Sequence, residues 1–175
     1  MQLDFRRPGQ PLQIRLLFVC LGNICRSPTA EGTMQHLVQR AKLDRCFQID
    51  SAGTSAWHAG EKANATSRKI ARTHGIELQS RSRQFQTRDF QSFDLILAMD
   101  SSNYQEILKM ARNPQDESRV VLFRTFDPEC DPFHPEDVPD PYYGGLDGFQ
   151  TVQEIIIRSC QNLLDRIRQD SQIST

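Results

Sequence analysis

Four short apolar runs, each followed by a segment of helical period, limit the fold of this chain more than any other feature. The runs cover residues 14–19, 46–53, 93–99 and 120–123. The first is apolar except for Arg15, as expected of a central parallel strand that helices cover on both faces. Strands that alternate with helices are typical of a doubly wound sheet with right-handed crossovers. The sequence therefore predicts an α/β fold, an open doubly wound sheet of four parallel strands with helices on both faces.

Helix start and stop signals lie between these runs. Ser27 is predicted to cap the first helix, with Pro28 in its first turn. A second helix is expected over residues 65–75 and is closed by Gly75, and Asp100 opens a third. These signals place one helix after each of the first three strands.

The last part of the chain has a different composition. Residues 125–148 are rich in Pro, Asp, Tyr and Gly and read as a loop, and a long amphipathic helix is predicted from about Phe149 to Arg168. The tails, up to about Gln10 and from about Asp170, are expected to be frayed. We therefore expect one domain over residues 1–175, with its core at about 14–168.

Composition and charge limit the possible partners. With 175 residues, 38% of them hydrophobic, the chain can bury the core of one domain. Its formal net charge of -1 provides no positive field for a nucleic acid or an anionic membrane. The apolar run at residues 16–21 is too short to span a bilayer, and the charged segment before it does not resemble a signal peptide. We expect a cytoplasmic protein whose 5 cysteines are free thiols.

The stretch VCLGNICRSPTAEG, residues 19–32, is the first strand-to-helix turn of this predicted sheet. Open α/β folds bind ligands at the carboxyl ends of their strands. Gly22 and Asn23 tolerate the left-handed backbone of a tight loop, whose amides can surround a tetrahedral oxyanion such as phosphate. The predicted phosphate-binding residues of this turn are Leu21, Gly22, Asn23, Ile24, Cys25 and Ser27.

Two side chains in this turn carry chemistry. Arg26 can donate two parallel hydrogen bonds to phosphate oxygens. Cys20 lies where the helix end, the loop amides and Arg26 all favour the thiolate, so we predict that it is the nucleophile. The Ser27 hydroxyl can donate to that thiolate, a role that competes with helix capping.

The same stretch resembles the signature of the low molecular weight protein-tyrosine phosphatases, whose loop is Cys, five residues, Arg and then Ser or Thr. The likeness continues in DSAGTSAWHAG at 50–60, HGI at 74–76, FDLILAMDSSN at 93–103 and DPYYGG at 140–145. These motifs follow the order and approximate spacing of that family over about residues 14–168. The resemblance implies the flavodoxin-like arrangement of the sheet.

The resemblance also implies an activity, hydrolysis of phosphotyrosine in proteins and of small aryl phosphates through a phosphocysteine on Cys20. Arg26 would clamp the phosphate, and Asp140 would protonate the leaving phenolate and then activate water. Trp57 and Tyr142 match the aromatic walls of the substrate cleft. No metal or cofactor is implied, because amides and Arg26 carry the charge of the phosphoryl group.

Further residues are assigned by the resemblance alone. Asn23 and Ser51 match positions that hold the loop, and Asp100 matches an acid that braces Arg26. Ser80 stands where many animal members carry a histidine, so it is left out of the site. The resemblance further implies a reversible disulfide between Cys20 and Cys25 that protects the nucleophile.

Two other functions remain to be weighed. An arsenate reductase could use the same loop, but it needs further thiols, and residues 60–128 contain no cysteine. A phosphate or flavin-phosphate binding module would need neither a nucleophilic Cys20 nor an acid loop. The retained Asp140 favours ester cleavage over both.

Overall fold

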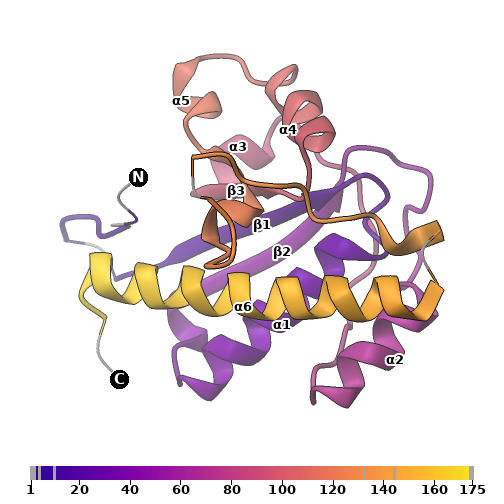
Figure 1. Ribbon diagram of the computed structural model, residues 1–175. Coiled ribbons are helices and arrows are strands. Elements are labelled where there is room, and N and C mark those ends of the chain that lie inside the picture. The colour runs from indigo at the N-terminus through magenta and orange to yellow at the C-terminus, as the bar shows by residue number, and fades with distance from the viewer. Residues whose placement is uncertain (1–2, 4, 10, 132, 144, 174–175) are drawn as a thin grey trace.

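A parallel sheet of four strands, in the order β2-β1-β3-β4, forms the centre of the computed structural model (Figure 1). The structure describes all residues except 1–2, 4, 10, 132, 144 and 174–175. The strands are β1 Ile14–Cys20, β2 Phe47–Gly53, β3 Leu95–Ala98 and β4 Val120–Leu122. Every strand pair is parallel, and helices cover both faces of the sheet, so the predicted doubly wound α/β fold is confirmed.

The register of the sheet places the end of β1 at the ligand-binding edge. Cys20 ends β1 and pairs with Gly53, which ends β2. On the other side of β1, Val19 pairs with Ala98 at the end of β3. The chain leaves β1 toward β2 on one side and later returns to β3 on the other, which is the topological switch point where such sheets bind ligands.

The helices connect the strands in the predicted order, together with short pieces that were not predicted. Four-residue helices are too short for a periodic apolar pattern to indicate them. The helices are α1 Arg26–Arg40, α2 Ala65–Thr73, α3 Asp89–Ser92, α4 Ser101–Leu108, α5 Pro114–Glu117 and α6 Gly145–Ser171, with the 3-10 helices η1 Asp44–Cys46, η2 Phe123–Phe126 and η3 Pro141–Tyr143. Over the residues that are described, none of these helices is both long and apolar enough to cross a membrane.

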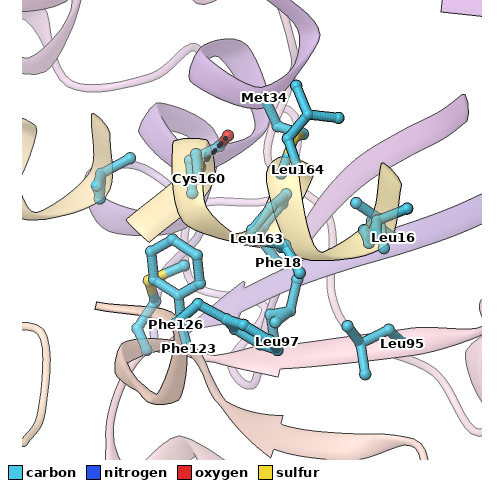
Figure 2. Close-up of a cluster of buried hydrophobic side chains, with 14 of the residues drawn as sticks. Leu16, Phe18, Met34, Leu95, Leu97, Phe123, Phe126, Cys160, Leu163 and Leu164 are labelled. Atoms are coloured by element: carbon cyan, nitrogen blue, oxygen red, sulfur yellow. Dashed lines mark hydrogen bonds between the residues drawn. The ribbon is translucent and has the colours of Figure 1, made fainter. Parts of the chain in front are cut away.

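The continuous apolar run of β1 serves both faces of the sheet. Successive side chains of a strand point to opposite faces. Leu16, Phe18 and Cys20 belong to the core that α1 and α6 cover, whereas Leu17 and Val19 belong to a second core on the other face. Figure 2 shows part of the first core, with labelled side chains from the sheet, from η2 and from α1 and α6. The ring of Phe18 meets that of Phe123 edge-on, with centroids 5.4 Å apart.

Helix α6 begins earlier and ends later than predicted. It starts at Gly145 and ends at Ser171 rather than at about Phe149 and Arg168. Residues 145–147 of its first turn are exposed. An exposed turn carries no apolar periodicity, and its Gly-rich composition made it look like part of the preceding loop.

The prediction that both tails are frayed was wrong for Leu3 and for the end of α6, which are packed, whereas residues 6–9 are exposed. Leu3 is 1% exposed and belongs to the core between the sheet and α6. Its backbone N–H donates to Asp170 Oδ2 at 2.7 Å, and its carbonyl accepts from Ser171 Oγ at 3.0 Å. Both ends of the chain lie at the same side of the molecule (Figure 1). The single buried leucine outweighs the polar composition of the tail.

The packing of Leu3 generates a stability prediction. Leu3→Ala should lower the free energy of unfolding by about 2 kcal/mol or more, as a buried leucine truncated to alanine does. Leu146→Ala is the matched control, because Leu146 is 53% exposed, and it should be nearly neutral. Urea unfolding measures both. Equal stability of the Leu3 variant and the wild type would show that this segment is not packed.

Candidate active site

A cavity of about 260 Å³ opens at the carboxyl end of β1. Cys20 lies in its wall and is 3% exposed. All predicted site residues except Asn23 and Ser27 line the cavity, together with one residue that was not predicted, His58. The lining residues are Cys20, Leu21, Gly22, Ile24, Cys25, Arg26, Trp57, His58, Asp140 and Tyr142.

The loop between β1 and α1 bends back toward the sulfur of Cys20. Asn23 has a φ of 53°, in the left-handed region, and its backbone N–H donates to Cys20 Sγ at 3.3 Å. Gly22, expected to share that conformation, is not among the described residues with positive φ. Its missing side chain serves close packing instead, because a Cβ there would lie 3.1 Å from His58 Cδ2. Gly53 is needed more strictly, since a Cβ would lie 2.7 Å from the carbonyl oxygen of Leu21.

Ser27 faces the sulfur rather than capping the helix. Helix α1 already begins at Arg26, and its N-cap residue, Cys25, makes no side-chain cap. The Ser27 hydroxyl lies 3.0 Å from Cys20 Sγ and 3.3 Å from the carbonyl of Ala52. The predicted cap is therefore wrong, because Ser27 lies inside the first turn and its hydroxyl faces the sulfur of Cys20. Its predicted contact with the sulfur is present.

Asn23 holds the loop from below. Its Nδ2 donates to Ser27 Oγ at 2.9 Å and to Ser51 Oγ at 2.8 Å, and its Oδ1 accepts from the backbone N–H of Arg83 at 2.9 Å. Both amide hydrogens are used, so the hydrogen of Ser27 is left for the sulfur or for Ala52. The Ser27 hydroxyl, which accepts from Asn23, can therefore donate to Cys20.

The far end of this network is Glu31, which the sequence analysis missed. Ser51 Oγ donates to Glu31 Oε2 at 2.5 Å. Glu31 is buried, and burial raises its pKa, although hydrogen bonds from Ser51 and Ser80 act to lower it. Ser80, left out of the predicted site, joins the network through this contact. Glu31 lies one helical turn after Ser27, and that spacing on one face of α1 was the available signal.

Arg26 is a buried cation held by three acceptors. Its NH1 donates to Asp100 Oδ2 at 2.6 Å and to the carbonyl of Val138 at 3.1 Å, and its NH2 donates to Asp140 Oδ2 at 3.0 Å. The expected brace from Asp100 is present. Burial acts to lower the pKa of Arg26, but the negative charges of Cys20, Asp140 and Asp100 outweigh it, and the pKa is raised. The guanidinium is therefore a permanent charge in the cavity wall.

Aromatic and acidic groups form the outer part of the cavity. Trp57 and Tyr142 are 76% and 52% exposed, so their rings are available to a ligand. The Tyr142 backbone N–H donates to Asp140 Oδ1 at 3.1 Å. His58 Nδ1 lies 3.1 Å from Glu61 Oε2. The sequence analysis did not assign His58 to the site, and its position directly after Trp57 was the available signal.

The two cysteines of the loop differ in character. Both are buried free thiols. Burial, with a further contribution from neighbouring Cys20, raises the pKa of Cys25 to about 12. Cys25 is therefore a neutral thiol at physiological pH and a poor nucleophile. The predicted Cys20–Cys25 disulfide stays a prediction.

The geometry and the fold together define a class of protein. A sulfur surrounded by donors, a permanent guanidinium and a carboxyl group converge on one concave site at the switch point of a doubly wound sheet. Among the residues described, no group of three or more His, Cys, Asp or Glu side chains could hold a metal ion. The class is that of doubly wound α/β proteins with a cysteine and an arginine in the loop after the first strand.

Comparisons with known proteins make the class specific. A family model described as low molecular weight phosphotyrosine protein phosphatase matches residues 15–173. A putative low molecular weight protein-tyrosine-phosphatase of Synechocystis is 42% identical over 151 residues, which cover 86% of this chain and 94% of that protein.

Solved structures agree with this match. A crystal structure of a protein tyrosine phosphatase from Entamoeba histolytica is similar with a TM-score of 0.82 and 39% identity, covering 90% of this chain and 98% of that chain. YfkJ from Bacillus subtilis is similar with a TM-score of 0.84 and 36% identity, covering 94% and 100%. The chain belongs to the low molecular weight protein-tyrosine phosphatase family and is a protein-tyrosine phosphatase.

Buried Glu31 generates a prediction about pH. A raised pKa means that folding favours the neutral carboxyl, so its contribution to stability is complete below about pH 4.5, the ordinary value, and is lost as pH rises through the raised pKa. Glu31→Gln is always neutral, so its stability relative to the wild type should increase as pH rises above that value. Urea unfolding at several pH values measures the difference.

Glu77→Gln is the control for this experiment, because the Glu77 side chain is 54% exposed and pairs with Arg72 at the surface. Its stability relative to the wild type should vary little over the same pH range. A Glu31→Gln difference that is independent of pH would contradict the assignment of a raised pKa.

Proposed function

We propose that Cys20 attacks the phosphorus of a phosphotyrosine and forms a phosphocysteine, while the tyrosine oxygen leaves. The observation that carries this proposal is the set of donors at the sulfur. The Asn23 backbone N–H and the Ser27 hydroxyl both reach Cys20 Sγ, at 3.3 and 3.0 Å. Hydrogen bonds to a thiolate stabilise it as the attacking group and later as the leaving group. The neutral Cys25 beside it leaves Cys20 as the nucleophile of the loop.

Arg26 is proposed to hold the phosphoryl oxygens and, by doing so, to release the acid. Its guanidinium donates to Asp100 with one nitrogen and to Asp140 with the other. A phosphate that takes two parallel hydrogen bonds from Arg26 competes with Asp140 for that second nitrogen. The Asp140 carboxyl then becomes available to the leaving oxygen, while Asp100 still fixes the guanidinium.

Asp140 is proposed as general acid and then as general base. In the first step its proton goes to the tyrosine oxygen as the P–O bond breaks and the S–P bond forms. In the second step the resulting carboxylate takes a proton from water, whose oxygen attacks phosphorus and displaces Cys20. The side chain is 44% exposed, which allows water to reach it. No metal is required, because Arg26 and the loop amides stabilise the charge that develops.

The proposed substrates are phosphotyrosine proteins and small aryl phosphates. Trp57 and Tyr142 present exposed rings at the cavity, and a flat phenyl ring can stack between such walls. The shorter side chain of phosphoserine would not reach them from the loop. We propose a cytoplasmic location, where such phosphoproteins are found.

The catalytic roles predict a pattern of activities on p-nitrophenyl phosphate. The wild type should hydrolyse this substrate with EDTA present. Cys20→Ser should abolish turnover, and Asp140→Asn should lower it by roughly 10²–10⁴-fold, the usual contribution of a general acid. Steady-state rates measure all three. Loss of wild-type activity in EDTA, or activity retained in Cys20→Ser, would contradict the mechanism.

The aromatic walls predict a difference between substrates. Trp57→Ala should lower kcat/KM for a phosphotyrosine peptide by about tenfold, the order expected for a lost stacking contact. Hydrolysis of an alkyl phosphate should be nearly unchanged. Because Trp57 is exposed, the variant should stay folded, and a thermal unfolding curve checks this. Equal losses on both substrates would show that Trp57 does not select the aryl group.

A further inference from the structure

The segment between β4 and α6 carries Asp140 and makes a long detour before it reaches the cavity. The detour consists of residues 127–131 and 133–137, which follow η2, and its end lies beside α4, where Asp137 contacts Ser101. None of these described residues belongs to a helix or strand, so side-chain contacts must support the approach of the chain to Asp140. The contacts of Arg124, a residue with no part in the proposed chemistry, answer this need.

Arg124 joins the two ends of the detour. Its Nε donates to Asp127 Oδ2 at 3.0 Å, at the start of the detour. Its NH1 donates to Glu136 Oε2 at 2.7 Å and to the carbonyl of Asp137 at 3.3 Å, at the end. The Arg124 side chain is 8% exposed, and that of Asp127 is fully buried. One buried guanidinium therefore holds the start and the end of the detour together.

The end that Arg124 fixes leads directly to the site. The Asp137 carboxylate accepts hydrogen bonds from the backbone N–H and the hydroxyl of Ser101, at 2.7 and 3.1 Å. The next residue, Val138, donates its N–H to the carbonyl of Met99 at 2.8 Å, and its own carbonyl accepts from Arg26. Asp140 follows two residues later.

Arg158 also binds Asp127, but unlike Arg124 it does not connect the two ends of the detour. It donates to both oxygens of Asp127, at 2.7 and 2.9 Å, from helix α6. Its other contact is to Glu129, and it reaches neither Glu136 nor Asp137 among the contacts of the described residues. Arg158 thus anchors only the start of the detour, whereas Arg124 connects the start to the end.

We propose that Arg124 is a positioning residue for the general acid, holding the end of the detour so that Asp140 meets the leaving oxygen. The proposal rests on the proposed role of Asp140. A displacement of the acid costs most where protonation of the leaving group matters most. Loss of Arg124 should therefore harm substrates with poor leaving groups and spare those with good ones.

The test measures kcat/KM for a series of aryl phosphates from phenyl phosphate to dinitrophenyl phosphate. For Arg124→Met we expect a fall of about 10²-fold with phenyl phosphate, and of less than about threefold with dinitrophenyl phosphate, whose phenolate needs no proton. Arg124→Lys, which keeps the charge but cannot span both ends, should lie between Arg124→Met and the wild type. If Arg124→Met does not fold, the same comparison of leaving groups is made with Arg124→Lys.

Arg119→Met is the matched control at the opposite end of β4. Arg119 donates to the carbonyl of Phe93 at 2.7 Å, and its side chain is 24% exposed. The Arg119→Met variant removes an arginine that precedes β4, whereas Arg124 follows this strand, and it leaves the contacts of the detour intact. Its dependence on the leaving group should equal that of the wild type.

A double variant separates positioning from general damage. If Arg124 acts through Asp140, Arg124→Met combined with Asp140→Asn should be no slower on phenyl phosphate than Asp140→Asn alone. Additive losses, or an equal loss on every substrate in the series, would overturn the proposal. If Asp140→Asn itself leaves the leaving-group dependence unchanged, the proposed role of Asp140 fails. A steeper dependence in Asp140→Asn but not in Arg124→Met would overturn the inference alone.

Discussion

The structure of the site depends on keeping one guanidinium, that of Arg26, charged inside the protein. Arg26 is 3% exposed, and a buried charge is costly unless it is paired and hydrogen-bonded. Its acceptors come from Asp100 after β3 and from Val138 and Asp140 in the segment before α6. Because parallel strands end at the same edge of a sheet, segments more than 70 residues apart in sequence converge on one side chain.

The sulfur of Cys20 depends on a second set of contacts that lies under the loop. Asn23 adopts a left-handed backbone and uses its side-chain amide to orient Ser27 and Ser51. Gly53 lets β2 approach the loop more closely than any side chain would permit. The loop is therefore shaped from both sides, with Arg26 held from the β3 side and Asn23 from the β2 side. Two buried acidic residues take part in further contacts outside the cavity. Glu31 accepts from Ser51, and Asp127 accepts from Arg124.

The sequence predicted best what is local along the chain. Strands β1 and β3 were recognised because a strand buried on both faces is apolar almost throughout, and Cys20 and Arg26 because they share one short loop. Asp140, Trp57 and Tyr142 were assigned only through the family resemblance, since nothing local distinguishes a catalytic aspartate from one in a turn. Each of them does line the cavity.

The residues that sequence reasoning missed depend on tertiary neighbours. Arg124 was indistinguishable from an ordinary charged residue until its burial was known, and for Glu31 the sequence offered only its spacing from Ser27. Leu3 lies in a polar tail, and its burial follows from packing in the core formed by the sheet and α6. Ser27 was expected both to cap the first helix and to contact the thiolate, and the contact with Cys20 Sγ is present while the cap is not. Burial and packing, which the local sequence does not show, decide these cases.

The most direct test of this account is to identify the atom that carries the phosphoryl group during turnover. Asp140→Asn protein mixed with an aryl phosphate should be quenched in denaturant within the first turnovers, and its peptides analysed by mass spectrometry. The account predicts phosphate on Cys20 and none on Cys25, because Cys20 lies among donors that stabilise its thiolate, whereas burial raises the pKa of Cys25 to about 12. Phosphate on another residue, or phenol release with no covalent phosphoenzyme, would contradict it.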